Sequence, residues 1–171
     1  VSNYLSLNTP YNGLLLFHGV GTGKTCAAVS IAEQFKEYVY ENDKNIFILT
    51  PSNTLTQQWK TEIFNYDKYN ENSILNNQCT GTDYSKIADT LNNINKINTK
   101  YLLTDSKKKK QINKIIDKYY KFYGYQKFSN FYHNITKNFT INEKIKFIKS
   151  NFSNCVFILD EIHYIRSNLT T

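Results

Sequence analysis

The stretch LLLFHGVGTGKT, residues 14–25, decides the fold. It opens with a short apolar run, which is typical of a buried strand, and continues into a glycine-rich turn. From Lys24 onward apolar residues recur at helical spacing, which predicts a helix that ends near Tyr40. A buried strand that leads through a glycine-rich turn into a helix is a setting in which proteins bind phosphate groups.

The phosphate-binding pattern is complete at its end and altered at its start. Its last three positions are Gly23, Lys24 and Thr25, whereas His18 stands where the full pattern has its first glycine. Glycines let backbone N–H groups curl around phosphates without a Cβ clash. The residues expected to bind the phosphates of ATP are Gly19, Val20, Gly21, Thr22, Gly23, Lys24 and Thr25.

Two side chains of this loop have a defined expected chemistry. Lys24 is expected to be catalytic by neutralising the β- and γ-phosphates, and Thr25 is expected to place its hydroxyl on Mg²⁺. The alternative is a plain glycine-rich turn, which the apolar run before it and the helix after it disfavour.

An acidic box follows the strongest apolar run of the second half. Asp160, Glu161, Ile162 and His163 come directly after residues 156–159, Val-Phe-Ile-Leu. An aspartate at a strand end can hold Mg²⁺, and the adjacent glutamate can orient and deprotonate the water that attacks ATP. We therefore expect Asp160 to be a metal ligand and Glu161 to be catalytic. Taken alone, the box could also be an exposed acidic turn that caps a strand.

Strands and helices alternate along the chain. Residues 46–50 form a second continuous apolar run, residues 73–79 and 120–125 are further strand candidates, and Ser52 or Asn53 can cap the helix that follows Pro51. Further helices are expected over residues 84–94, 112–119, 126–134 and 141–149. This order predicts an α/β fold with a parallel sheet covered on both faces, and ligands bind such sheets beyond the carboxyl ends of the strands.

The chain is basic and has no membrane-spanning run. Its 171 residues carry a net charge of +7, almost all of it from lysine. A polyanion partner fits this charge, but solvated lysines are the commoner explanation, and residues 107–110 are expected to be a solvated loop in a surface insertion at residues 95–110. Trp59, at helical spacing with Leu55 and Ile63, is expected in the core rather than as a platform for stacked bases.

Three cysteines indicate neither a disulfide framework nor a zinc site. Cys26, Cys79 and Cys155 are odd in number and widely spaced. The first ten residues also have neither the basic start nor the apolar stretch of a signal peptide. We therefore expect a reducing, intracellular compartment.

Both motifs resemble those of a known superfamily. Residues 18–25 and 160–163 resemble the first and second motifs of the DExH branch of superfamily 2 helicases, in which the first loop glycine is often replaced. Residues 50–59 resemble the motif that contacts the sugar-phosphate backbone. Residues 3–18 and 120–128 are similar to segments of the helicase-like ATPases of large DNA viruses, the poxvirus early transcription factor and nucleoside triphosphatase type. Residues 84–118 match no segment that we can name.

The resemblance implies a fold, an activity and partners. It implies a P-loop NTPase fold, the first of two RecA-like domains, over residues 1–171, truncated after the acidic box. It implies the cofactors ATP and Mg²⁺, hydrolysis of ATP, and DNA or RNA as a partner that Pro51, Ser52 and Asn53 contact. His163 would couple ATP to nucleic-acid binding, or it is an ordinary hydrogen-bonded histidine.

The same resemblance implies a setting for the chain. A second RecA-like domain and transcription machinery would be its protein partners, and it would work inside the cell, in the host cytoplasm or the virion if it is viral. The isolated chain would hold half of an active site and would be inactive.

Two other function classes stay open. A P-loop kinase or nucleotide switch would need a phosphoacceptor or base-specificity site, and the sequence shows none. A non-catalytic scaffold would hold nucleotide or a protein partner without turnover, which fits an isolated half-site.

Overall fold

A computed structural model describes residues 4–17, 21–69, 79–97 and 104–168 of the chain. The chain divides into two compact units. The helical unit comprises Val1–Phe35 and Trp59–Lys118, and the sheet unit comprises Lys36–Gln58 and Tyr119–Thr171.

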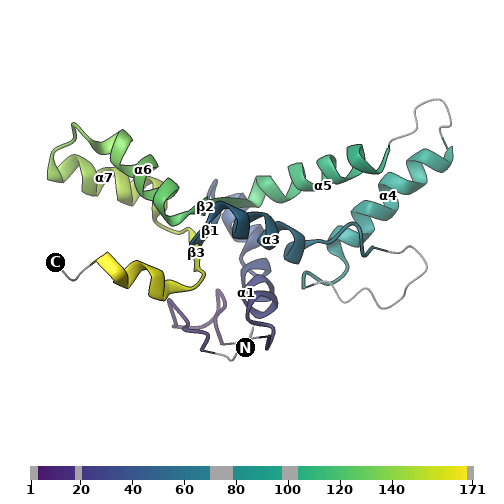
Figure 1. Ribbon diagram of the computed structural model, residues 1–171, viewed down its shortest axis with the longest axis horizontal. Helices are drawn as coiled ribbons and strands as arrows, with labels where there is room; N and C mark the ends of the chain where they lie inside the picture. Colours follow the sequence, from purple (N-terminus) through teal and green to yellow (C-terminus); the bar gives the residue numbers. More distant parts are fainter. Residues whose placement is uncertain (1–3, 18–20, 70–78, 98–103, 169–171) are drawn as a thin grey trace. The chain divides into compact units, whose positions relative to one another are not determined.

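The sheet unit is built on three parallel strands (Figure 1). They are β1 (Ile46–Thr50), β2 (Tyr120–Gly124) and β3 (Val156–Leu159), in the order β2-β1-β3. All three lie where the sequence predicts a strand, and both ladders of β1 are parallel as expected. Every residue of β1 is buried, which explains its unbroken apolar run.

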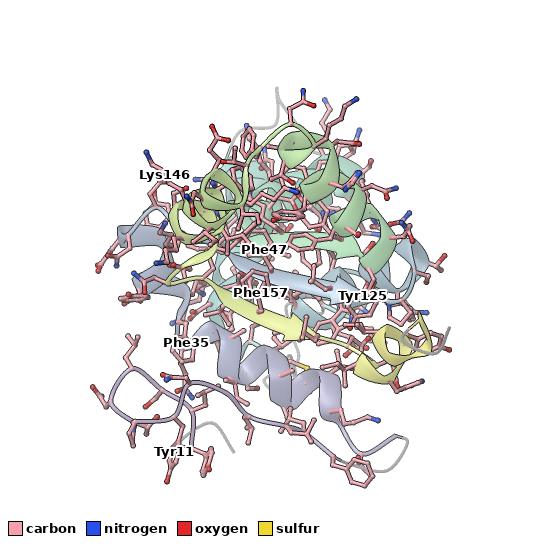
Figure 2. All side chains as sticks on the ribbon, turned by 90° about the vertical axis from the view of Figure 1, so that its left-hand side faces the viewer. Tyr11, Phe35, Phe47, Tyr125, Lys146 and Phe157 are labelled. Atoms are coloured by element: carbon pink, nitrogen blue, oxygen red, sulfur yellow. A yellow bond between two sulfur atoms is a disulfide. The ribbon has the colours of Figure 1, made fainter. Side chains whose placement is uncertain are left out.

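Aromatic rings cover one face of this sheet. Phe47 of β1 stacks on Phe157 of β3 with ring centroids 4.9 Å apart, and Figure 2 shows the two side chains on neighbouring strands. Helices α6 (Tyr125–Thr136) and α7 (Ile141–Phe152) add Phe128 and Phe152 to the cluster, with ring centroids 6.0 and 5.6 Å from that of Phe47. Each such ring pair contributes about 0.5–1.5 kcal/mol beyond the area that it buries, so the cluster ties both helices to the sheet.

The remaining helix of the sheet unit begins a few residues after α1. A single helix was expected from Lys24 to about Tyr40, but α1 ends at Glu33 and α2 (Lys36–Glu41) is separate. The ring of Tyr40 contacts that of Tyr119 with centroids 5.5 Å apart.

The helical unit contains α1 (Lys24–Glu33), α4 (Asp83–Ile97), most of α5 (Asp105–Tyr119) and the second half of α3 (Asn53–Ile63). Trp59 is 4% exposed, which confirms its place in the core. Ser52 accepts a hydrogen bond from the Leu55 N–H through its side chain and so caps α3, as predicted. The other fully buried residues of the unit include Val29, Ile63, Tyr84, Ala88, Ile112 and Ile116.

The prediction of a strand before the glycine-rich turn is wrong. Residues 14–17 have no regular structure, and Leu15 and Phe17 are 74% and 93% exposed. An apolar run becomes a strand only when a neighbouring strand supplies its hydrogen bonds. Among the described residues, β1 already has β2 and β3 on its two sides. The other uncertain strand, at residues 73–79, lies almost wholly outside the described residues.

The prediction that the lysines at residues 107–110 form a solvated loop is also wrong. Residues 107–110 belong to α5, and Lys108 is only 8% exposed. Its ammonium group donates to the side chain of Asn92 and lies 3.6 Å from the carboxylate of Asp105, while Lys109 pairs with Asp67. Asp105 in the first turn favours the helix by opposing its dipole. The predicted insertion at 95–110 is helical at both ends and is still a prediction.

Within the described part of the chain, no helix combines the length and the apolar character needed to cross a membrane.

A disulfide that the sequence did not predict joins two parts of the helical unit. Cys26, in the first turn of α1, is bonded to Cys79 across a sequence separation of 53 residues. The Ser30 hydroxyl donates to the Cys79 carbonyl oxygen at 3.0 Å, so residue 79 is held to α1 twice. Cysteine spacing could not reveal this pair, because no local pattern brings the two residues together.

Replacing Cys79 with serine should lower the free energy of unfolding. A disulfide that closes a loop of this length stabilises a protein by about 4 kcal/mol at most, because it restricts the unfolded chain. Denaturant unfolding without reductant measures the loss, and Cys155→Ser is the control because Cys155 is outside the disulfide. Equal unfolding curves for the two variants, together with a non-reducing peptide map of the wild type in which Cys26 and Cys79 are not linked, would contradict the bond.

Candidate nucleotide and nucleic-acid site

The described part of the phosphate loop has a backbone suited to binding an anion. Gly21 and Gly23 both have φ of 76°, a left-handed conformation that residues with a side chain rarely adopt. A Cβ at either position would meet nothing within 4 Å, so this side of the loop is open. His18, Gly19 and Val20 lie outside the described residues.

Helix α1 begins directly after Gly23. Its N-cap residue, Gly23, has no side chain that could cap the helix, and the first turn of α1 holds no acidic residue that would offset the positive end of the helix dipole. Lys24 and Thr25 are the first two helical residues. A left-handed glycine loop, an uncapped helix start and a lysine are together suited to the phosphates of ATP.

The acidic box lies at the carboxyl end of β3. The Asp160 N–H donates to the Leu49 carbonyl oxygen at 2.9 Å, which extends the ladder with β1 by one residue. The Tyr125 hydroxyl donates to the Asp160 carbonyl oxygen at 2.7 Å. Both polar groups of the Asp160 backbone therefore have protein partners on two different elements.

Glu161 turns the chain away from the sheet. Its φ is 52°, a left-handed conformation that costs a non-glycine residue about 1–2 kcal/mol. The 3₁₀-helix η2 (Ile162–Asn168) follows, and the Tyr164 N–H donates to the Glu161 carbonyl oxygen at 3.0 Å. His163 Nδ1 lies 3.2 Å from Glu161 Oε2, but both side chains are well exposed, so this contact adds little stability.

The predicted nucleic-acid residues lie at the same edge of the sheet. Pro51, Ser52 and Asn53 follow the carboxyl end of β1, and the Thr50 hydroxyl donates to the Ser52 carbonyl oxygen at 2.7 Å. A Cβ on Gly124, the last residue of β2, would lie 3.1 Å from Asn53 Oδ1, so the absence of a side chain there lets Asn53 approach closely. Three separate stretches of sequence therefore end together at one edge.

Sequence reasoning missed Tyr125, the first residue of α6. It lies at the end of the sheet where the strands terminate (Figure 2). Burial, together with the charges of Asp160 and Glu161, raises the pKa of Tyr125 to about 12. The hydroxyl therefore keeps its proton and stays a donor to Asp160. The only signal in the sequence was a glycine that ends an aromatic strand with a tyrosine directly after it.

The two halves of the predicted nucleotide site belong to different units. The phosphate loop is in the helical unit and the acidic box is in the sheet unit, so a ligand shared by Lys24 and Asp160 is still a prediction. Among the residues described, no group of three or more His, Cys, Asp or Glu side chains could hold a metal ion.

Comparison with known proteins decides the family. The family model described as "Type III restriction enzyme, res subunit" matches residues 3–170. The chain belongs to this family. The match covers both motifs and confirms the resemblance to superfamily 2 helicase-like proteins, together with the α/β fold of a partial RecA-like domain. This chain is therefore the ATP-binding part of a helicase-type protein.

Relatives of this helicase-type chain occur in large DNA viruses. A provisionally named ATP-dependent RNA helicase, R563 of Acanthamoeba polyphaga mimivirus, is 32% identical over the whole chain, which covers 24% of that protein. A provisionally named helicase, 087L of Invertebrate iridescent virus 3, is 30% identical over 97% of the chain and 14% of that protein. The early transcription factor large subunit homolog of African swine fever virus (isolate Tick/Malawi/Lil 20-1/1983) is 28% identical over 82% of the chain and 13% of that protein.

The helicase-type chain spans a quarter or less of the length of these relatives. No solved structure matches it significantly.

Replacing Tyr125 with phenylalanine should remove one late step from the alkaline titration. Because the folded pKa is above the ordinary value of 10.0, the protonated phenol stabilises the sheet unit below pH 10, and this contribution is lost as the pH rises towards about 12. Tyrosinate absorbance, measured with a chelator present, should show one group fewer titrating near pH 12 in Tyr125→Phe. A variant that instead lacks a group titrating near pH 10 would contradict the environment described for Tyr125.

Proposed function

We propose that this chain is the ATP-binding part of a motor that hydrolyses ATP while it is bound to DNA or RNA. The observation that carries the proposal is the left-handed backbone of Gly21 and Gly23 directly before the uncapped start of α1. The acidic box at the carboxyl edge of the sheet, together with family membership, supports hydrolysis rather than binding alone.

Four side chains would divide the chemistry. Lys24 would neutralise the β- and γ-phosphates, and Thr25 and Asp160 would hold Mg²⁺. The metal, when bound, would offset negative charge on the phosphate oxygens. Glu161 would orient the attacking water and accept its proton at a carboxylate oxygen. Phosphate binding by the backbone of residues 19–23 would fix the substrate against these groups.

Nucleic acid would bind along the carboxyl edge of the sheet unit. Ser52 and Asn53 are exposed at the start of α3, and the positive end of a helix favours phosphate. Pro51, directly before them, would contact the same nucleic-acid backbone. His163 would couple the two activities, because its ring contacts the Glu161 carboxylate and both side chains are open to solvent.

The relatives suggest where the parent protein works. Their names include RNA helicases and an early transcription factor subunit, all from viruses. We propose that a second RecA-like domain of the parent chain completes the site, and that the parent acts with transcription machinery inside the infected cell or the virion. A free scaffold role would remain only if the parent protein binds ATP without turnover.

Replacing Lys24 with alanine in the parent protein should weaken ATP binding. The loss of a charge-assisted contact of about 1.5–3 kcal/mol corresponds to a roughly 10- to 150-fold higher Kd. Titration with a fluorescent ATP analogue measures it, and Lys146→Ala on the exposed part of α7 is the matched control. Unchanged affinity in Lys24→Ala would remove the phosphate loop from the proposal.

Replacing Glu161 with glutamine in the parent protein should keep ATP binding and slow turnover about 10²- to 10⁴-fold, the usual contribution of a general base. Phosphate release should be followed with no nucleic acid and with single-stranded DNA, duplex DNA or RNA. Glu41→Gln, at the exposed last residue of α2, is the control and should behave like the wild type. A wild-type rate that no nucleic acid stimulates would argue against a motor, and full turnover in Glu161→Gln would exclude Glu161 as the base.

A further inference from the structure

The backbone of the acidic box is held at two consecutive peptide bonds, one on each side of Asp160. The N–H of Asp160 is bound to β1 through the Leu49 carbonyl oxygen, and the C=O of Asp160 accepts from the Tyr125 hydroxyl at 2.7 Å. That carbonyl belongs to the peptide between Asp160 and Glu161, so a bond to it restrains the rotations that aim both carboxylates.

The restraint acts where the backbone needs one. The next rotation along the chain is φ of Glu161, which at 52° is in the left-handed region. A residue with a side chain leaves this region readily unless its neighbours fix it. The Tyr164 N–H holds the far side of Glu161 at 3.0 Å, and the Tyr125 hydroxyl holds the near side.

Tyr125 is itself well placed for this role. It begins α6 directly after β2, and β2 lies beside β1 in the sheet, so its position is set by a different part of the chain from β3. Residues 125 and 160 are 35 positions apart. Displacement of α6 or of β3 would therefore break this contact without any change in the box itself.

We infer that Tyr125 is a positioning residue for the acidic box, in which its hydroxyl holds the Asp160–Glu161 peptide so that the two carboxylates face metal and water in a fixed direction. The inference rests on the proposed function for its effect on turnover, but the contact can be tested without it. Its hydroxyl donates to the Asp160 carbonyl oxygen, so its effect on turnover would act through Asp160 and Glu161.

The test compares Tyr125→Phe with Tyr123→Phe in the parent protein. Tyr123 is two residues earlier, in β2, and contacts Phe47, Phe128 and Phe131 through its ring, so its variant controls for loss of a tyrosine hydroxyl near the same end of β2. The expected result for Tyr125→Phe is a kcat about tenfold lower, equal to about 1.4 kcal/mol, with ATP affinity within about twofold of the wild type. Tyr123→Phe should change neither quantity.

Hydrogen exchange provides a readout that does not need turnover. In Tyr125→Phe the amides of residues 160–164 should exchange faster, while those of α7 should be unchanged. If the wild-type parent does not hydrolyse ATP, the proposed function fails and exchange still decides whether Tyr125 holds the box. Unchanged exchange over residues 160–164, or equal effects of both variants on kcat, would overturn the inference; faster exchange throughout the sheet unit would show a merely structural role and would also overturn it.

Discussion

The sheet unit depends on the complete burial of β1 between two parallel neighbours. A strand with five buried residues must place its backbone groups on other strands, and β2 and β3 accept this role on opposite sides. Because both pairings are parallel, all three strands end at one edge. The polar residues that follow them are Ser52 and Asn53, Tyr125, and the acidic box, and the parallel ladders bring these residues to the same edge.

β3 leads into the acidic box, to which we assign the proposed chemistry, yet it is the least buried of the three strands. Phe157 and Leu159 are 39% and 41% exposed, so burial alone does not fix it. It is held by its ladder with β1, by the stacking of Phe157 on Phe47, and at its end by Tyr125. The position of the Asp160 backbone is therefore set by its hydrogen bonds to β1 and α6. Packing defects in the aromatic cluster would reach the box through this route.

How far the sequence predicted the molecule depends on how local each cause is. The strand at residues 46–50 was predicted correctly because burial on both faces requires an unbroken apolar run, and the strand at residues 156–159 was predicted from a similar run, although it is only partly buried. The cap at Ser52 needs only its own helix. The strand prediction for the equally apolar residues 14–17 failed because a strand also needs a neighbouring strand with which to form hydrogen bonds. The predictions of a solvated lysine loop and of cysteines without a disulfide failed for the same reason. The partners, Asn92 for Lys108 and Cys79 for Cys26, come from distant positions in the sequence. Tyr125 contacts the box through one oxygen, which leaves no periodicity to detect.

The phosphate loop and the acidic box both contain residues in the left-handed backbone conformation, but the residue types that adopt it differ. Gly21 and Gly23 adopt the left-handed conformation at no steric cost, because glycine has no side chain. The turn after β3 needs that conformation too, but there a glycine would remove the carboxylate expected to activate water. Glu161 therefore carries a strain of about 1–2 kcal/mol, which the bonds to the carbonyl oxygens of Asp160 and Glu161 on either side of its backbone can offset. Strain of this kind persists where neighbouring contacts fix it, and here those contacts flank the residue to which the chemistry is assigned.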